Sequence, residues 1–476
     1  MAEIGDDVFF AGIHELNAKL TSKEISAEEL ARAFATRLEQ LGPRYNALAL
    51  PLRQEALRKA REVDQDIKRD RLRGPLQGIP YGIKDLLSFA GQPTTWGARP
   101  YAAQVFDHNA TVVERLAGVG AVLTGKLSMV ELAGGGGYRF PSASLTGPGL
   151  NPWDRTRWSG GSSSGSAAAV AAGLVPFAIG SETSGSILTP AAYCGVTALR
   201  PTYGLVSRYG AMALSWTLDK LGPFGRSAED CGLILQVIGG KDGNDPGSAG
   251  KSFYYTPQYA RPVKDLKIGY APVDFTDRAD APARPAFAAA LEVLKAAGAH
   301  LVETRLPDFP YGTALSVILA AEEGSIFETL ITSGKVDELA DQTQIAGLKA
   351  SLDTPAKDYL KAMRMRRLIQ AEFSKLFAQV DVLVAPARSG PASRVEEPLD
   401  RGAGAPPARG LPPGFQGIIQ AGNLAGLPAL ALPCGFADNL PVALQLVGAP
   451  FSENLLLAVG KEFQARTDWH KRRPRV

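Results

Sequence analysis

Residues 159–173 constrain the fold more than any other part of the chain, because nearly all of them are small. The segment reads Ser-Gly-Gly-Ser-Ser-Ser-Gly-Ser and continues as Ala-Ala-Ala-Val-Ala-Ala-Gly. Glycine reaches backbone conformations that other residues avoid, and the alanine run favours a helix that packs closely. A flexible linker is the alternative, but linkers do not usually run into an apolar helix. The segment therefore predicts a turn that directs N–H groups and hydroxyls at one point and opens a buried helix.

Helical patterns alternate with short apolar runs along the rest of the chain. Residues 11–40 carry apolar residues at helical spacing, and Ser26-Ala-Glu-Glu29 fits a capping box. This alternation predicts an α/β fold with a covered sheet. We find no internal repeat and no clear linker, so we expect one domain over residues 1–476. The expected buried strands lie at 79–83, 121–124, 175–179, 266–270 and 380–385.

Two segments are typical of loops. Residues 239–262 are rich in Gly, Asp, Ser and Pro, which predicts a surface excursion. Residues 387–414 carry many Pro, Gly and Arg without periodicity. Long loops often act as lids over functional sites, and a mobile surface insertion is the alternative for residues 387–414.

The composition limits the chemistry that the chain can perform. It has 476 residues, a formal net charge of +3, 4 His and 3 Cys. This charge gives no support for nucleic-acid binding, and the scattered His and Cys give none for a metal site or disulfide framework. No signal sequence or membrane-spanning apolar run is visible, so we expect a cytoplasmic protein. Hydrolytic chemistry would have to proceed without histidine.

A second Gly/Ser cluster, Gly180–Ser186, follows the apolar run at 175–179. A serine at the end of a tight turn, beside successive N–H groups, has the layout of a nucleophile next to an oxyanion hole; an ordinary strand-to-helix connection is the alternative. Such a serine needs a base, and a buried neutral lysine can serve. Lys84 is the candidate, although a solvent-reaching lysine or an ion pair with Asp85 explains the residues more simply.

Gly161–Gly165 also matches the G-x-S-x-G pattern of α/β-hydrolases. That motif needs a strand directly before it and a histidine after it. No strand pattern precedes it here, and only His300 and His470 follow. We therefore set this alternative aside.

Three motifs together resemble those of the amidase signature hydrolases. Gly78–Asp85 matches G-I-P-x-x-x-K-D, residues 160–173 match G-G-S-S-x-G-S before an Ala-rich helix, and Gly180–Ser186 matches the family's nucleophile turn. The similarity is densest over 78–240, and residues 195–223 are most similar to the amidotransferase A subunit. The resemblance implies an α/β fold with a mixed central sheet covered on both faces by helices, in one domain, with no cofactor or metal.

The resemblance also implies a Ser–cis-Ser–Lys triad. Neutral Lys84 would take a proton from Ser162, which follows a cis peptide bond and takes one from the nucleophile Ser186. Ser186 would form an acyl-enzyme that water then cleaves. Ser163 would hydrogen-bond the lysine, and Gly161 would support the bridging serine. The implied oxyanion donors are the backbone N–H groups of Thr183, Ser184, Gly185 and Ser186.

The nucleophile turn departs from the family pattern at three positions. Glu182 and Ser184 replace the usual Asp and first Gly, and Leu188 replaces the usual Arg. We expect the missing Arg to remove a network that fixes the loop and to favour an uncharged, apolar or aryl substrate group. The residues expected by analogy to contact that group are Met129, Phe140, Leu188, Leu214 and Trp216.

These features predict a free-standing serine hydrolase that cleaves the C–N bond of linear amides, and also carbamates and esters. One alternative is a urethanase, whose main activity is carbamate cleavage. The other is the glutaminase subunit of a tRNA-dependent amidotransferase, which the missing Arg disfavours. We expect a small-molecule substrate, no nucleic-acid or membrane partner, and a monomer or homodimer.

Overall fold

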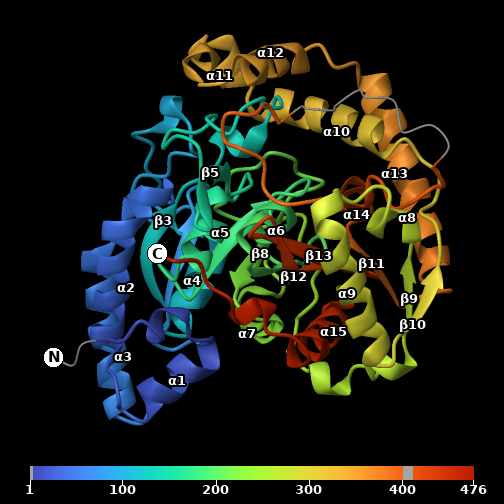
Figure 1. Ribbon diagram of the computed structural model, residues 1–476. Helices are drawn as coiled ribbons and strands as arrows, with labels where there is room; N and C mark the ends of the chain where they lie inside the picture. The colour runs from blue at the N-terminus through green and yellow to red at the C-terminus, as the bar shows by residue number, and fades with distance from the viewer. Residues whose placement is uncertain (1–3, 400–410) are drawn as a thin grey trace.

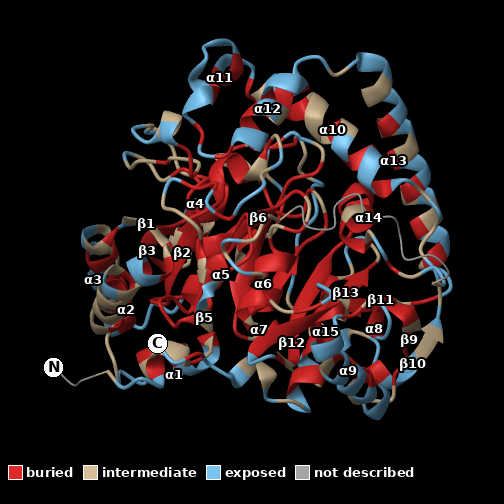
Figure 2. Cartoon of the chain, turned by 45° about the horizontal axis from the view of Figure 1, so that its top comes forward, coloured by how far each residue is buried: buried red, intermediate tan, exposed pale blue. Residues whose placement is uncertain are grey.

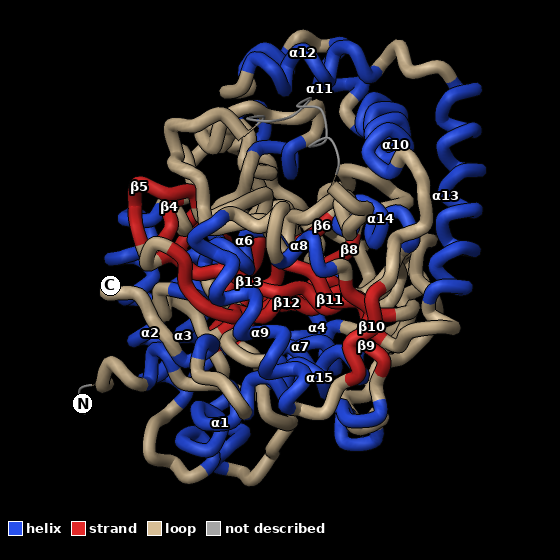
Figure 3. Tube along the Cα trace, turned by 45° about the vertical axis from the view of Figure 1, so that its right-hand side comes forward, coloured by secondary structure: helices blue, strands red, loops and turns tan. Residues whose placement is uncertain are grey.

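A mixed β-sheet runs through the middle of the protein, with helices on both of its faces (Figures 1 and 3). The computed structural model describes residues 4–399 and 411–476. The predicted fold class is confirmed. The strands of this sheet are β1 (Leu48–Pro51), β2 (Pro80–Lys84), β3 (Val122–Leu127), β6 (Phe177–Glu182), β7 (Thr197–Arg200), β8 (Lys220–Gly225), β9 (Lys267–Tyr270), β10 (His300–Glu303), β11 (Val382–Pro386), β12 (Ala429–Ala437) and β13 (Leu440–Gly448).

The strand order is β1-β3-β2-β6-β8-β7-β12-β13-β11-β9-β10. Strand β2 is parallel to β3 and β6, and β9 is parallel to β10 and β11, whereas the other neighbours are antiparallel. A separate small sheet pairs β4 (Leu150–Asn151) with β5 (Asp154–Trp158). The order places β2 beside β6, so the two segments that carry the candidate catalytic motifs are neighbours.

Fifteen α-helices lie in the described residues, and α10, α11 and α12 stand apart from the sheet at the top of Figure 1. The helices are α1 (Ile13–Thr21), α2 (Ala27–Leu41), α3 (Arg53–Lys68), α4 (Thr111–Gly118), α5 (Ser164–Ala171), α6 (Leu188–Cys194), α7 (Ala228–Ile238), α8 (Pro272–Phe275), α9 (Arg284–Ala296), α10 (Tyr311–Ile326), α11 (Glu328–Thr332), α12 (Gln342–Ser351), α13 (Ala356–Leu376), α14 (Ile418–Ala425) and α15 (Glu453–Ala465). Within the described residues, no helix is long and apolar enough to span a bilayer.

The expected elements are present, with ends that move by a few residues. The helical pattern at 11–40 forms α1 and α2, and the capping box at Ser26 and Glu29 is formed. The expected strands at 79–83, 266–270 and 380–385 appear as β2, β9 and β11. Hydrophobic periodicity therefore placed these elements correctly.

Burial is most complete at the centre of the sheet and in helix α5 (Figure 2). Every residue of β2, β3, β6 and β8 is buried, because helices cover both faces. Every residue of α5 is buried too. A Cβ atom at Gly165 would lie 2.5 Å from the carbonyl oxygen of Ala47 and from the backbone nitrogen of Ser128. The small residues at 159–173 therefore let this helix approach neighbouring backbone directly.

The two loop-like segments differ in their surroundings. Residues 241–248 are not a free excursion, because Asp242 and Asp245 bind residues 207–208 through hydrogen bonds. In the second segment, residues 400–410 lie outside the described residues, so the expectation of a lid or surface insertion there is not addressed. Its first part packs against β5, since Trp158 donates a backbone hydrogen bond to Ser393.

Candidate active site

Lys84 is the last residue of β2 and is completely buried. Its Nζ atom lies 2.6 Å from Ser162 Oγ, 3.1 Å from Ser163 Oγ and 2.9 Å from Ser181 Oγ. Burial lowers the pKa of this lysine to about 7, although the carboxylates of Asp219 and Glu182 oppose the shift. The neutral form, which is rare for lysine in water, is thus accessible to Lys84 near neutral pH.

The bridging position is held by an unusual backbone. The peptide bond between Gly161 and Ser162 is cis, and the Ser162 carbonyl oxygen accepts a hydrogen bond from Val130 N at 3.0 Å. Ser163 Oγ donates to the Ser181 carbonyl oxygen at 3.1 Å. Because its proton is used there, Ser163 can only accept from Lys84. A neutral Lys84 can therefore donate to Ser163 and Ser181 and keep its lone pair for the Ser162 proton.

The candidate nucleophile turn joins β6 to α6. Gly185 has a φ of +91°, which only glycine adopts easily, and Ser186 is partly exposed. Within the described part of the chain, no acceptor is bonded to the backbone N–H groups of Thr183, Ser184, Gly185 and Ser186, nor does any group bind Ser186 Oγ. Unpaired donors beside a free hydroxyl are what an oxyanion hole next to a nucleophile requires.

Buried Glu182 anchors this turn. Its Oε2 accepts hydrogen bonds from Ile187 N at 2.8 Å and Leu188 N at 3.0 Å, and its Oε1 pairs with Arg200 Nη1 at 2.8 Å. Burial alone would raise the pKa of Glu182, but Arg200, the Asn423 amide and the Leu188 N–H lower it to about 2. Leu188 stands where the family has an Arg, and we expected the turn to lose its ionic network for that reason. The turn is nevertheless held by such a network, in which Arg200 of β7 is the cation.

Asp219 links the turn to the neighbouring loop. Its Oδ1 accepts from Thr183 Oγ1 at 2.6 Å, and its Oδ2 accepts from Leu214 N at 2.8 Å and Ser215 N at 2.9 Å. Burial raises the pKa of Asp219, while these hydrogen bonds oppose the rise. One carboxylate thus holds an expected oxyanion residue and an expected pocket residue in fixed positions.

A cavity of about 520 Å³ reaches this region, and Ser181 and Thr183 form part of its wall. Of the expected pocket residues, Leu214 and Trp216 line it. The structure places the other three elsewhere. Met129 is completely buried against Gly97, Leu188 is buried in the core at the start of α6, and Phe140 is 38% exposed on a loop held by Asp341.

A second cavity, of about 570 Å³, is lined by Ser184 and Gly185 of the same turn. Its wall is more polar and includes Arg388, Gln416 and Gln445. The candidate nucleophile turn therefore contributes residues to two cavities of different character. Within residues 4–399 and 411–476, no three His, Cys, Asp or Glu side chains cluster as metal ligands would.

The motifs did not identify Ser181, Asp219, Arg200 or Asn423 as site residues. Ser181 and Thr183 follow the expected strand at 175–179 and are two residues apart, so a continued strand places them on one face. That spacing is a signal by which Ser181 could have been found. A strand that ends in Arg200 is a comparable signal, because a cation at a buried strand position needs a partner. The other two contacts join segments far apart in the chain and leave no local pattern.

Comparison with known proteins assigns the family. Residues 29–457 match the family described as Amidase. The chain belongs to the amidase family. It is 38% identical to the A subunit of glutamyl-tRNA(Gln) amidotransferase from Carboxydothermus hydrogenoformans, over 99% of this chain and 100% of the relative. It is 39% identical to the protein of that name from a Synechococcus strain, over 97% of this chain and 93% of the relative. Among solved structures, peptide amidase from Stenotrophomonas maltophilia matches with a TM-score of 0.83 and 31% identity, over 96% of this chain and 97% of that one.

These relatives correct the expectation about partners. We expected a small-molecule partner, no nucleic-acid partner, and a monomer or homodimer. That expectation came from the balanced charge and from the departures in the nucleophile turn. The relatives are, by name, subunits of an amidotransferase for glutamyl-tRNA(Gln), and the match spans nearly the whole chain. Net charge sums over the whole surface, so it carries no information about a local interface or about subunit assembly.

Proposed function

We propose that this protein hydrolyses the C–N bond of a carboxamide through an acyl-enzyme on Ser186. The observation that carries the proposal is the buried Lys84, whose Nζ lies 2.6 Å from Ser162 Oγ beside the Thr183–Ser186 turn. A lysine with a pKa of about 7 can accept a proton at neutral pH. The four unpaired N–H groups of the turn supply donors for the oxyanion.

Each residue of the proposed triad has one role in the reaction. Lys84 accepts the proton of Ser162, Ser162 accepts that of Ser186, and Ser186 Oγ bonds to the amide carbon. The C–N bond then breaks, and the departing nitrogen takes a proton back through Ser162. Water adds to the acyl-enzyme by the same proton route, breaks the ester bond and releases the carboxylic acid.

Glutamine is the first candidate substrate. The relatives' name and the near-complete match support an ammonia-releasing subunit that serves transfer onto glutamyl-tRNA(Gln). This candidate predicts stable partner subunits and release of ammonia from free glutamine. It also agrees with a turn that keeps its carboxylate–guanidinium network through Glu182 and Arg200.

A stand-alone amidase for apolar or aryl amides is the second candidate. It is favoured by the cavity beside Thr183, whose lining includes Met212, Leu214, Leu221 and the half-exposed Trp216. The similarity to a peptide amidase is consistent with it. Carbamate and ester cleavage rest on the shared triad chemistry alone.

The test labels the purified protein with a sulfonyl fluoride probe and maps the modified peptide by mass spectrometry. Labelling at Ser186, lost in Ser186→Ala together with amide hydrolysis, is expected. Labelling at another serine in an active sample would refute the mechanism. A panel of glutamine, acetamide, phenylacetamide, an aryl carbamate and an aryl ester, with a pull-down for partner subunits, separates the candidates.

A further inference from the structure

Residues 241–248 contain no helix or strand, yet part of them forms one wall of the 520 Å³ cavity. Asn244, Asp245, Pro246 and Gly247 line it, together with Tyr203, Arg208 and Trp216. The remaining wall is mostly apolar, and one part of the lining, Ser181 and Thr183, adjoins the candidate triad. The position of this irregular segment therefore affects the width of a cavity beside the proposed reaction centre. The apolar lining residues are Leu86, Ala133, Ala211, Met212, Ala213, Leu214 and Leu221.

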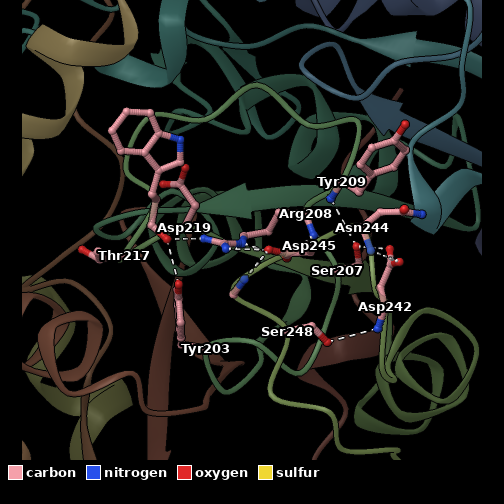
Figure 4. A network of polar contacts seen from close by, with 12 residues as sticks. Tyr203, Ser207, Arg208, Tyr209, Thr217, Asp219, Asp242, Asn244, Asp245 and Ser248 are labelled. Carbon is pink, nitrogen blue, oxygen red and sulfur yellow. Dashed lines mark hydrogen bonds and ion pairs between the residues drawn. The ribbon is translucent and has the colours of Figure 1, made fainter.

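Two aspartates hold the segment in place (Figure 4). Asp242 Oδ2 accepts hydrogen bonds from Thr111 Oγ1 and Ser207 Oγ, both at 2.6 Å. Asp245 Oδ2 accepts from the backbone nitrogen of Arg208 at 2.8 Å and from its Nε at 3.1 Å, and Oδ1 accepts from Nη2 at 2.8 Å. Both aspartates thus tie the segment to residues 207–208, as the dashed lines in Figure 4 show.

Arg208, the partner of Asp245, also contacts the aromatic part of the cavity wall. Its Nη1 donates to the Trp216 carbonyl oxygen, which also accepts from Tyr203 Oη at 2.7 Å. The guanidinium lies 5.0 Å from the centroid of the Tyr203 ring. The side chains of Arg208 and Asp245 are only 14% and 4% exposed, so water screens their interaction weakly.

Gly247 packs against Arg208 and Tyr203 so closely that it has no room for a side chain. A Cβ atom on Gly247 would lie 2.0 Å from Arg208 Nη2 and 2.8 Å from Tyr203 Oη. A Cβ on Gly204 would lie 2.5 Å from the Gly247 carbonyl oxygen. The ion pair and this close packing therefore hold residues 245–247 against residues 203–208.

Within the described residues, the charged groups that line the cavity are all paired or hydrogen-bonded. Its charged lining residues are Arg208, Asp219 and Asp245. Arg208 and Asp245 neutralise each other, and both Asp219 oxygens accept hydrogen bonds. A carboxylate placed here would meet two further carboxylates, whereas the 49% exposed Trp216 side chain offers an aromatic surface that a ligand would remove from water.

We propose that the Arg208–Asp245 pair is a clamp that sets the width of this cavity, and that the cavity selects an uncharged aromatic group on the amide substrate. The proposal rests on the proposed hydrolysis at Ser186 and deepens its second candidate, the amidase for apolar or aryl amides. Arg208, Asp245 and Trp216 are specificity-determining residues in this view, and they take no part in bond cleavage.

The test compares Asp245→Asn, Arg208→Lys and Trp216→Ala with wild type on phenylacetamide and acetamide. Trp216→Ala should raise the KM for phenylacetamide at least tenfold, because an aromatic contact is lost. Each clamp variant should raise it about fivefold, because a buried hydrogen-bonded pair is disrupted. The kcat/KM for acetamide should stay within about twofold in all three, since its methyl group does not reach the aromatic wall.

Asp468→Asn is the matched control, because it breaks an Asp–Arg pair whose members, Asp468 and Arg472, are each 55% exposed. Asp468→Asn should leave the KM and kcat/KM for both substrates unchanged. Equal losses on both substrates, or none on phenylacetamide, would overturn the clamp while leaving hydrolysis at Ser186 intact.

Binding to Ser186→Ala separates this proposal from the proposed function. Phenylacetamide is titrated into that variant and followed by calorimetry, with Trp216→Ala added as a second change. Binding that weakens at least tenfold with the second change supports the aromatic cavity even if the wild type hydrolyses no amide. Absence of binding, or binding that Trp216→Ala does not affect, refutes it even if glutamine is hydrolysed.

Discussion

Lys84 and Lys126 lie on the neighbouring strands β2 and β3, and both side chains are completely buried. Their partners differ. Lys84 contacts the hydroxyls of Ser162, Ser163 and Ser181. Lys126 lies 2.8 Å from Asp85 Oδ1 and donates to the Pro93 carbonyl oxygen at 2.8 Å. Among the described residues, Lys84 therefore bonds only to neutral partners, whereas Lys126 has a carboxylate partner.

This difference decides what each lysine can do. Burial lowers the pKa of both, because the charged form loses hydration. Asp85 opposes the shift directly at Lys126, whereas Lys84 feels only the more distant Asp219 and Glu182 and its pKa falls to about 7. Lys126 is thus suited to hold the strand ends together as a cation. Lys84 is suited to give and take a proton.

The largest expected effect comes from replacing each lysine by methionine. Lys84→Met should lower kcat by about 10²–10⁴, because the proposed base is removed. Lys126→Met should leave Asp85 buried without its cation and lower the free energy of unfolding by about 3–5 kcal/mol. Amide turnover and thermal unfolding measured on both variants test this contrast. It fails if Lys126→Met loses turnover while it unfolds at the wild-type temperature.

Lys84→Met should also unfold no earlier than wild type at pH 7. The folded pKa of Lys84, about 7, lies below its ordinary value of 10.5. The unfolded chain therefore binds more protons between these two values, and the contribution of this group to stability rises with pH across that window. At pH 7 the buried lysine costs stability, which methionine restores. A lower unfolding temperature for Lys84→Met would contradict this account.

The next largest effect concerns the ion pair between Glu182 and Arg200, which anchors the turn that carries the proposed nucleophile. Glu182→Gln should cost about 3–5 kcal/mol of stability, because Arg200 is left buried without its counter-charge. It should also lower kcat by about 10², because the turn that presents Ser186 loses an anchor. Glu453→Gln is the control, since this buried glutamate accepts from Thr202 N at 2.8 Å away from the turn. Similar kinetic losses in both variants would exclude a specific role for Glu182.

The pH dependence of Glu182 has a definite sign. Its folded pKa, about 2, lies below the ordinary 4.5. The stabilisation is therefore present above about pH 4.5 and is lost as the pH falls towards 2. Urea unfolding at pH 7 and pH 3 should show a smaller gap between wild type and Glu182→Gln at the lower pH. A constant gap would mean that the carboxylate charge is not what stabilises the turn.

A smaller effect is expected from pH on turnover. The kcat/KM for an uncharged amide should rise about tenfold per unit below pH 7 and level off above it, because only neutral Lys84 accepts the Ser162 proton. The profile is measured from pH 5 to 10, with thermal unfolding recorded at each pH. A flat profile in an enzyme that still requires Ser186 would exclude a titrating lysine base.

Sequence reasoning identified what lies within motifs and missed what depends on register. The resemblance pairs Lys84 with Ser162 through contiguous motifs, while the residues alone leave an ion pair between Lys84 and Asp85 open. The structure pairs Asp85 with Lys126 instead, because successive side chains on a strand point to opposite faces. Strand periodicity gave β2 and β3 but not their register, and that register brings Lys126 to Asp85.

The same limit explains the other differences. The missing Arg at position 188 suggested a loosened turn, but Arg200 reaches Glu182 from β7. Residues 241–248 carry loop composition, which predicts irregular backbone correctly and gives no information about what the loop packs against. Their contact with Arg208 depends on a tertiary fold that local patterns do not encode.

The smallest expected effect refines the environment of Lys84 itself. Ser181→Ala removes one of its three hydroxyl partners, so kcat should fall about threefold to tenfold. The charged lysine loses more than the neutral one when an acceptor is removed, so the rising limb of the pH profile should move to lower pH. Ser166→Ala is the matched control, because the buried Ser166 hydroxyl bonds the Ile179 carbonyl oxygen at 3.5 Å and no other group in the described part of the chain. A shift of the limb to higher pH would mean that Ser181 stabilises the neutral amine. In that case the difference in pKa between Lys84 and Lys126 would result from burial and not from the three hydroxyl partners of Lys84.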